Sequence, residues 1–142
     1  FEEYNNEKEF IYSIIIKIFN GEKILKLTRG QQKRDFIHIK DFKRLLILFF
    51  KKKIIRKYTK FEIGSSKSYS IKSVILLIKK IMSSNIATNF GYFNYKKNED
   101  FSMKSNIKSL VNIKWKPLIN LSTGIRSLMN EIKFKQFKIK KY

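Results

Sequence analysis

Helical and β-like patterns alternate along this sequence, and that alternation restricts its fold more than any other feature. Large apolar side chains recur at spacings of three and four residues in four stretches, which span positions 11–18, 42–49, 71–78 and 125–132. This spacing predicts amphipathic helices. Short β-forming runs lie between them at 24–28 (ILKLT), 35–39 (DFIHI) and 58–63 (YTKFEI), with glycines at joints 21, 30 and 64. We therefore predict an α/β domain rather than a helical bundle.

The predicted helix ends carry residues that favour them. Asn20 and Gly21 supply a stop after the first helix, while Ser70 and Asn120 are candidate N-caps of the third and fourth. Residues 84–118 are less regular, and we expect a loop with a short strand in NFGYFNYKKNEDF and a short helix around 107–111. Pro117 is expected to end this excursion before the last helix begins.

The chain is strongly basic. Its 142 residues suffice for one core, which we place in residues 1–135, with a basic tail at 136–142. A net charge of +21 is typical of proteins that bind polyanions, so a basic RNA-binding, ribosome-associated protein from an AT-rich genome is one hypothesis. The lysines are nevertheless spread along the chain, and codon bias towards A and T would raise lysine and isoleucine together.

Several kinds of chemistry are excluded by composition. Without cysteine and with one histidine, the chain offers no thiol nucleophile and no cluster of Cys or His ligands for a metal. The longest apolar run, at 45–50, is far shorter than the roughly 20 residues that cross a bilayer. We expect a cytoplasmic protein with no membrane partner and no metal.

Four segments occur in an order that resembles a known enzyme family. They are GQQKRDFIHIKD at 30–41, FEIGSSKSYSIKSVILLIKKI at 61–81, NYKKNEDFSMKSNIKSL at 94–110, and WKPLINLSTGI at 115–125. Together they resemble the carboxy-terminal part of NAD(P)-dependent nucleotide-sugar epimerases and dehydratases, the extended short-chain dehydrogenase/reductase family. The resemblance spans about residues 5–132. It implies the substrate-binding portion of a Rossmann-type fold.

The resemblance implies a substrate-binding role for Arg34. In the family, the arginine of the RDFIHV-type segment reaches the diphosphate of the nucleotide sugar. A planar guanidinium suits this role because it forms paired, charge-assisted hydrogen bonds with phosphate oxygens. The alternative is a structural Arg34 that pairs with Asp35.

Two further substrate contacts are implied by the same resemblance. Lys96 stands where the family often has a second phosphate-binding arginine, and a solvated lysine is the alternative. Phe10 lies in a segment that resembles the helix beside the nucleotide base, with core packing as its alternative.

The remaining matched positions are expected to shape the fold rather than to do chemistry. His38 is interpreted as a strand residue. Ser66 stands where the family has a second glycine, and this strand-to-helix turn is expected to be structural. The other positions assigned to packing are Gly64, Trp115, Pro117 and Gly124.

The family's cofactor and catalytic motifs are not found in these residues. No GxxGxxG turn for a dinucleotide can be written. Tyr92 and Lys96 have the spacing of the family's catalytic pair, but they follow the GSSKSYSIK segment, whereas the family's pair precedes it on a long helix. We therefore assign no catalytic residue.

The sequence thus predicts a fragment of a nucleotide-sugar epimerase or dehydratase whose N-terminal dinucleotide-binding half is missing. Such a fragment would contribute diphosphate binding and be inactive alone. NAD or NADP would serve the complete enzyme, with none expected to bind the fragment alone. Its partners would be a nucleotide-diphosphate sugar and, in a split gene, a separately encoded N-terminal half; nucleic acid is not expected. The RNA-binding protein and a non-catalytic interaction domain remain alternatives, while sugar, base and oligomeric state are left open.

Overall fold

The computed structural model describes residues 9–52 and 60–139 of the chain, and it has an α/β fold. Its helices and strands follow the order α1 (Phe10–Phe19), β1 (Ile24–Leu27), β2 (Lys33–Asp35), α2 (Ile39–Lys52), β3 (Ser68–Ser70), α3 (Ile71–Ile81), β4 (Ala87–Phe90), α4 (Lys108–Asn112) and α5 (Leu121–Ile139). The strands form two small sheets: β1 pairs in parallel with β4, and β2 pairs antiparallel with β3. α5 therefore continues into the residues that the sequence assigned to a tail.

The helix predictions are confirmed, including their caps. Gly21 takes a left-handed φ of 72° after α1. The Ser70 side chain accepts a hydrogen bond from the Ser73 amide at 3.1 Å, and the Asn120 side chain accepts one from Thr123 at 2.9 Å. These contacts satisfy amide groups that the first turn of a helix leaves without partners. Because capping is local, the sequence was sufficient to predict it.

The strand prediction for 35–39 is wrong beyond its first residue. β2 ends at Asp35 and α2 begins at Ile39. His38 is not a strand residue: its carbonyl accepts the amides of Asp41 and Phe42, and its Nδ1 accepts the Lys40 amide. It starts the helix. The run at 24–28 is confirmed as β1, whereas that at 58–63 lies partly outside the described residues and is not a strand at 60–63.

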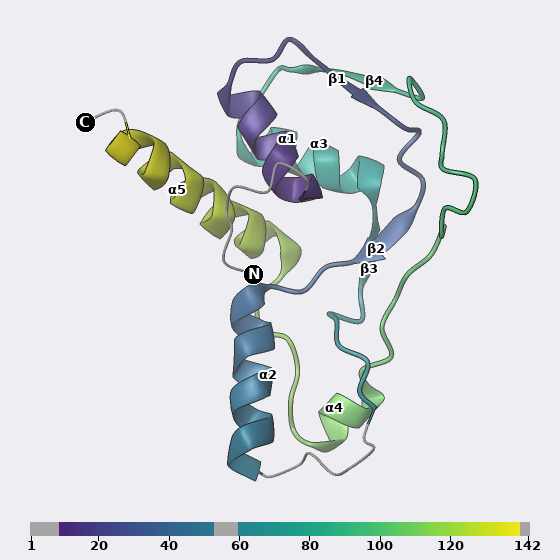
Figure 1. Cartoon of the computed structure of the whole chain (residues 1–142), viewed down its shortest axis with the longest axis vertical. Helices are drawn as coiled ribbons and strands as arrows, with labels where there is room; N and C mark the ends of the chain where they lie inside the picture. Colours follow the sequence, from purple (N-terminus) through teal and green to yellow (C-terminus); the bar gives the residue numbers. More distant parts are fainter. Residues whose placement is uncertain (1–8, 53–59, 140–142) are drawn as a thin grey trace.

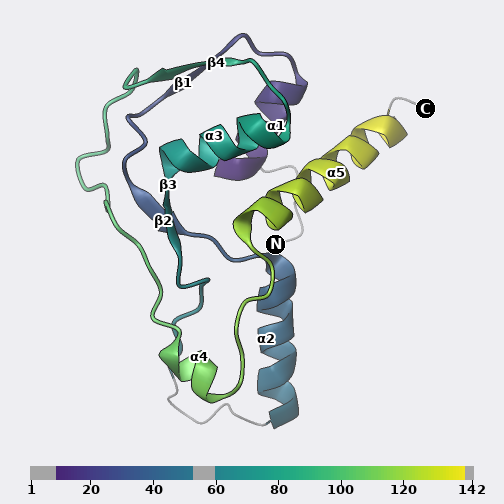
Figure 2. The same cartoon turned by 180° about the vertical axis from the view of Figure 1, so that it is seen from behind.

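Two hydrophobic clusters hold the elements together. The larger lies among α1, α3, α5 and the β1–β4 pair, with Ile15, Leu25 and Ile75 fully buried. The smaller joins α2 to α4 and the loop after it through Leu45 and Trp115. Both ribbon views show this division, with α2 and α4 at one end of the molecule (Figures 1 and 2). Within the described residues, no helix has the length and apolarity to span a membrane.

The buried carboxylate of Asp41 fastens the loop before α5 onto α2. Asp41 is 2% exposed, and its oxygens accept the amides of Leu118 and Ile119 at 2.9–3.1 Å. Arg44, one turn later, pairs with the same carboxylate at 2.8 Å and donates to the Lys116 carbonyl at 2.5 Å. The irregular region before α5 therefore ends at Pro117, as predicted. The Asp41 carboxylate holds the two residues after this proline against α2.

Close packing of α5 depends on Gly124. A Cβ built on Gly124 would lie 3.1 Å from Cδ2 of His38. This confirms a packing role for Gly124 and identifies the partner as the histidine at the start of α2. Trp115 is 3% exposed in the smaller cluster, as predicted.

Candidate functional site

Strand β2 lies between two other chain segments. On one side it pairs with β3, where Arg34 is opposite Tyr69. On the other side the Lys33 amide donates to the Phe101 carbonyl at 2.9 Å, and the Lys33 carbonyl accepts the Met103 amide at 3.1 Å. Side chains alternate along a strand, so Arg34 projects from the face opposite to Lys33 and Asp35. The strand thus fixes the backbone of the arginine from both sides.

The Arg34 guanidinium is held by the segment at 99–100. Its Nη2 forms an ion pair with Glu99, and its Nη1 donates to the carbonyls of Asp100 at 2.6 Å and Lys33 at 2.9 Å. Its side chain is 25% exposed. The pairing with Asp35 that the sequence offered as the alternative is not found. Arg34 is instead a cation with a defined orientation, beside a carboxylate far away in sequence.

Asp35 has a structural task that the sequence did not reveal. Its carboxylate accepts the amides of Ser65 at 2.7 Å, Ser66 at 3.0 Å and Ser105 at 3.1 Å, together with the Ser65 hydroxyl. These bonds fasten the turn at 64–66 and the loop at 105 to β2. The only sequence clue was a carboxylate next to Arg34 and a Gly-Ser-Ser turn, which does not specify the pairing.

The Gly64–Ser66 turn is built for close packing, as predicted. A Cβ on Gly64 would lie 2.6 Å from the Asp35 carboxylate and 2.7 Å from Cβ of Ser105. Ser66 has a φ of 59°, in the left-handed region that favours glycine. This is the position where the family has its second glycine, and the backbone still adopts a conformation suited to one.

Ser66→Gly is therefore expected to raise the free energy of unfolding by about 0.5 kcal/mol. Relief of the left-handed strain exceeds the extra chain entropy of glycine in the unfolded state. Urea denaturation measures the change. Ser65→Gly is the contrasting variant, since it removes a hydroxyl bonded to Asp35 and should lower stability; equal effects of the two changes would contradict the strain argument.

Lys96 lies on the segment that runs alongside Arg34. The Gln31 amide donates to the Tyr95 hydroxyl at 3.0 Å, and the Glu99 amide donates to the Lys96 carbonyl at 3.1 Å. Lys96 is exposed. The structure thus brings its segment beside that of Arg34, although the two are 62 positions apart in sequence.

Phe10 does not share this location. It is the first residue of α1, half-buried, and it packs against the larger hydrophobic cluster. Its core-packing alternative therefore has direct support in the contacts. Contact with a nucleotide base remains a prediction.

Tyr92 and Lys96 do not form a helical pair. Both lie between β4 and α4, outside any helix, and both are exposed. Tyr92 instead contacts Lys26, whose ammonium lies 4.6 Å from the centre of its ring. This arrangement does not match the helix-borne Tyr/Lys pair of the family.

The start of α3 does not offer free amides to the pyrophosphate of a dinucleotide. Pyrophosphate binding needs free amides at a helix start that follows a strand. α3 follows β3 directly, but its first amides are already bonded: Ile71 to the Gln32 carbonyl, Lys72 to that of Gly30, and Ser73 to the Ser70 hydroxyl. This helix start is used for packing.

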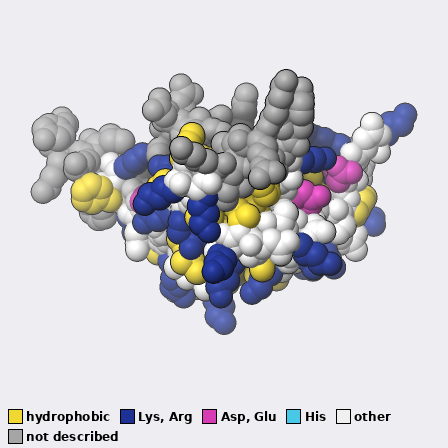
Figure 3. Space-filling model, turned by 90° about the horizontal axis from the view of Figure 1, so that it is seen from below, with side chains coloured by type: hydrophobic (Ala, Val, Ile, Leu, Met, Phe, Trp, Pro, Cys, Tyr) yellow, Lys and Arg dark blue, Asp and Glu magenta, His cyan; other side chains and the backbone are white. Residues whose placement is uncertain are grey.

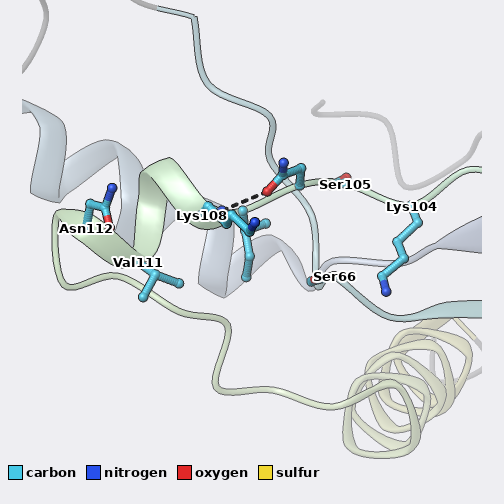
Figure 4. A pocket seen from close by; sticks show the side chains of 8 residues that line it. Ser66, Lys104, Ser105, Lys108, Val111 and Asn112 are labelled. Carbon is cyan, nitrogen blue, oxygen red and sulfur yellow. Dashed lines mark hydrogen bonds between the residues drawn. The ribbon is translucent and has the colours of Figure 1, made fainter.

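A shallow hollow of about 560 Å³ lies beside the Gly64–Ser66 turn, between Ser66 and residues 104–108 and 111–112 (Figure 4). Lys104 and Lys108 are among the side chains around it. None of Arg34, Lys96 and Phe10 lines it. The hollow is thus separate from the predicted substrate contacts.

Comparison with known proteins supports the family resemblance that the sequence segments indicated. The family model for the NAD dependent epimerase/dehydratase family matches residues 2–64, which include Arg34. The CDP-abequose synthase of Salmonella typhimurium is 28% identical over 131 residues, covering 90% of this chain and 44% of that protein. The chain thus resembles the NAD dependent epimerase/dehydratase family. It spans less than half the length of this curated relative.

Solved structures of other proteins share the fold of this chain. A UDP-glucose 4-epimerase from Thermotoga maritima, solved with UDP-glucose, superposes with a TM-score of 0.79 at 15% identity, over 95% of this chain and 42% of that one. A UDP-glucuronic acid 4-epimerase from Bacillus cereus, solved with NAD, gives 0.75 at 23% identity, over 91% and 39%. The RNA-binding alternative receives no support from these comparisons.

Proposed function

We propose that this chain contributes the diphosphate-binding part of a nucleotide-sugar epimerase or dehydratase, with Arg34 as its main phosphate contact. The observation that carries the proposal is the oriented guanidinium of Arg34 on β2, within the residues that the family model matches. Arginine bonded to a carboxylate can exchange that partner for a phosphate, because both present two oxygens in a plane. Glu99 would thus remain paired with Arg34 until the substrate binds.

The substrate we propose is a nucleoside-diphosphate sugar. The curated relative is named for a CDP-sugar, and the Thermotoga maritima structure contains UDP-glucose. Lys96 would add a second positive charge on the neighbouring segment, as a point charge without paired geometry. Phe10, at the start of α1, is proposed to approach the base.

We further propose that the chain acts with a dinucleotide-binding part, encoded with it or separately, and does not turn over substrate alone. The bonded amides at the start of α3 support this division, since they leave no site there for a pyrophosphate. NAD or NADP would bind that other part. Turnover of a nucleotide sugar by this chain alone would contradict the proposal that it needs a dinucleotide-binding part.

Arg34→Ala is expected to weaken UDP-glucose binding roughly tenfold or more, because a charge-assisted pair is lost. Arg34→Lys should lose part of the affinity, since lysine keeps the positive charge but cannot form the paired hydrogen bonds of a guanidinium. Lys96→Ala should give a smaller loss of about threefold. Titration of the isotope-labelled chain, followed by amide NMR shifts, measures each dissociation constant and reports whether each variant is folded.

Three controls separate a phosphate site from general electrostatics. Lys97→Ala removes a neighbouring charge that is also exposed, and it should leave binding unchanged. Uridine, which lacks phosphate, should bind wild type and Arg34→Ala equally. Glu99→Gln should tighten UDP-glucose binding, because it weakens the partner that competes for Arg34. Weaker binding by Glu99→Gln, or unchanged binding by Arg34→Ala, would remove Arg34 from the site.

A further inference from the structure

We propose that the distal part of α5, residues 132–139, binds the surface of a lipid bilayer with anionic headgroups, without crossing it. This inference goes beyond the proposed function, and it involves none of the residues assigned to substrate. It also revises the expectation that the chain has no membrane partner. That expectation rested on the length of the apolar runs, which decides whether a segment spans a bilayer but not whether a helix lies on one.

α5 extends past the core that it packs against. It comprises 19 residues, and its side chains in the larger hydrophobic cluster include Ile125 at 2% and Ile132 at 4% exposure. The side chains that the structure describes after Ile132, at 133–135, are all exposed. Both ribbon views show this end of the helix projecting beyond the other helices and strands (Figures 1 and 2). The distal part of α5 is therefore accessible to a partner.

A second apolar face begins where the core contacts of α5 end. Phe134 is 63% exposed, and helical geometry places its position about 160° around the axis from Ile132, which faces the core. Position 137, also a phenylalanine, follows on the next turn, about 60° around the axis from position 134. A helix that packs on one body needs one apolar face, so the phenylalanines indicate a second, apolar partner.

Lysines flank this second face. Lys133 and Lys135 stand on either side of Phe134 in the sequence, and both are exposed. The Lys133 ammonium lies 5.9 Å from the centre of the Phe19 ring at the end of α1, which keeps this part of α5 in contact with the body of the molecule. Residues 132–139 hold three lysines and no aspartate or glutamate. Figure 3 shows hydrophobic side chains exposed beside Lys or Arg side chains on the left, the side on which α5 projects in Figure 1.

An anionic bilayer suits both kinds of side chain. Phenylalanine rings enter the boundary between headgroups and acyl chains, while lysine stems extend along it and carry their ammonium groups to the lipid phosphates. The negative surface potential of anionic lipids attracts clustered lysines. A nucleic acid would engage the lysines through its phosphates, but it would offer the phenylalanines no apolar layer to enter. The combination of phenylalanine and lysine therefore favours lipid as the partner.

Vesicle sedimentation tests this association with the whole chain. The probes are large vesicles of phosphatidylcholine, alone or mixed with an equal amount of phosphatidylglycerol. The chain should sediment with the mixed vesicles, and the bound fraction should fall steeply without phosphatidylglycerol. Phe134→Ser should weaken binding to the mixed vesicles roughly tenfold, and Lys133→Gln combined with Lys135→Gln should weaken it by a similar factor. Equal binding of the wild type to both kinds of vesicle, or binding to neither, would overturn the proposal.

Matched variants, each checked for folding by circular dichroism, locate the contact on α5. Phe93→Ser removes a ring that is 52% exposed between β4 and α4, and it should leave vesicle binding unchanged. Lys43→Gln combined with Lys51→Gln removes two exposed charges from α2 and should weaken binding far less than the α5 pair. A loss as large from Phe93→Ser as from Phe134→Ser would overturn the proposal. Binding of a single-stranded RNA in place of the vesicles, undiminished by Phe134→Ser, would also overturn it and identify a nucleic acid as the partner.

Discussion

Asp41→Ala is expected to lower the free energy of unfolding by about 3 kcal/mol or more. The carboxylate is 2% exposed and accepts the amides of Leu118 and Ile119, so its loss leaves buried donors without partners. Arg44 also loses its ion pair. Since these bonds hold the loop before α5 onto α2, both hydrophobic clusters should loosen. Urea denaturation followed by fluorescence of the single, buried Trp115 measures the change.

The matched control is Asp100→Ala. Asp100 is exposed and takes part in the Arg34 site only through its carbonyl, so the change should stay within about 0.5 kcal/mol. Asp41→Asn keeps the shape of the side chain and one acceptor oxygen, and it should fall between wild type and Asp41→Ala. If Asp41→Ala and Asp100→Ala had equal effects, Asp41 would not be an anchor.

The sequence predicted the parts of the fold that depend on neighbouring residues. Helical periodicity, the Ser70 and Asn120 caps and the Gly21 stop all act within about one helical turn, and each is found. The segment after Asp35 shows the limit of this reasoning. Its β-forming composition favoured a strand, yet α2 begins at Ile39, with His38 bonding three amides of its first turn. Composition alone does not reveal where such a cap will form.

The resemblance proposed residues for the candidate site, but it did not predict the contacts that those residues make. Arg34 was named as a candidate from the resemblance, but its ion pair with Glu99 joins residues 65 positions apart, and nothing local specifies that pair. Asp35 was taken as the alternative partner of Arg34, whereas it bonds to the Gly64–Ser66 turn and to Ser105. Such pairings depend on how β2 is placed between β3 and residues 101–103, which is a property of the whole fold.

Gly64→Ala is expected to lower the free energy of unfolding by about 3 kcal/mol. The added methyl group would overlap Oγ of Ser105 and lie 2.6 Å from the Asp35 carboxylate, which is itself fixed by three amides. Neither neighbour can withdraw without breaking hydrogen bonds. Urea denaturation measures the loss, and amide NMR shifts at Ser65, Ser66 and Ser105 should report displacement of the turn.

Two further variants separate overlap from backbone strain. Gly21→Ala introduces the same methyl group where φ is 72° and no atom lies within 4 Å, so it should lose only about 1 kcal/mol through strain. Ser105→Gly in the Gly64→Ala background removes the overlapping hydroxyl and the Cβ 2.7 Å away, and it should restore part of the stability. Residues that share a contact have non-additive effects. Strictly additive losses from Gly64→Ala and Ser105→Gly would therefore show that the turn does not pack against Ser105 as described.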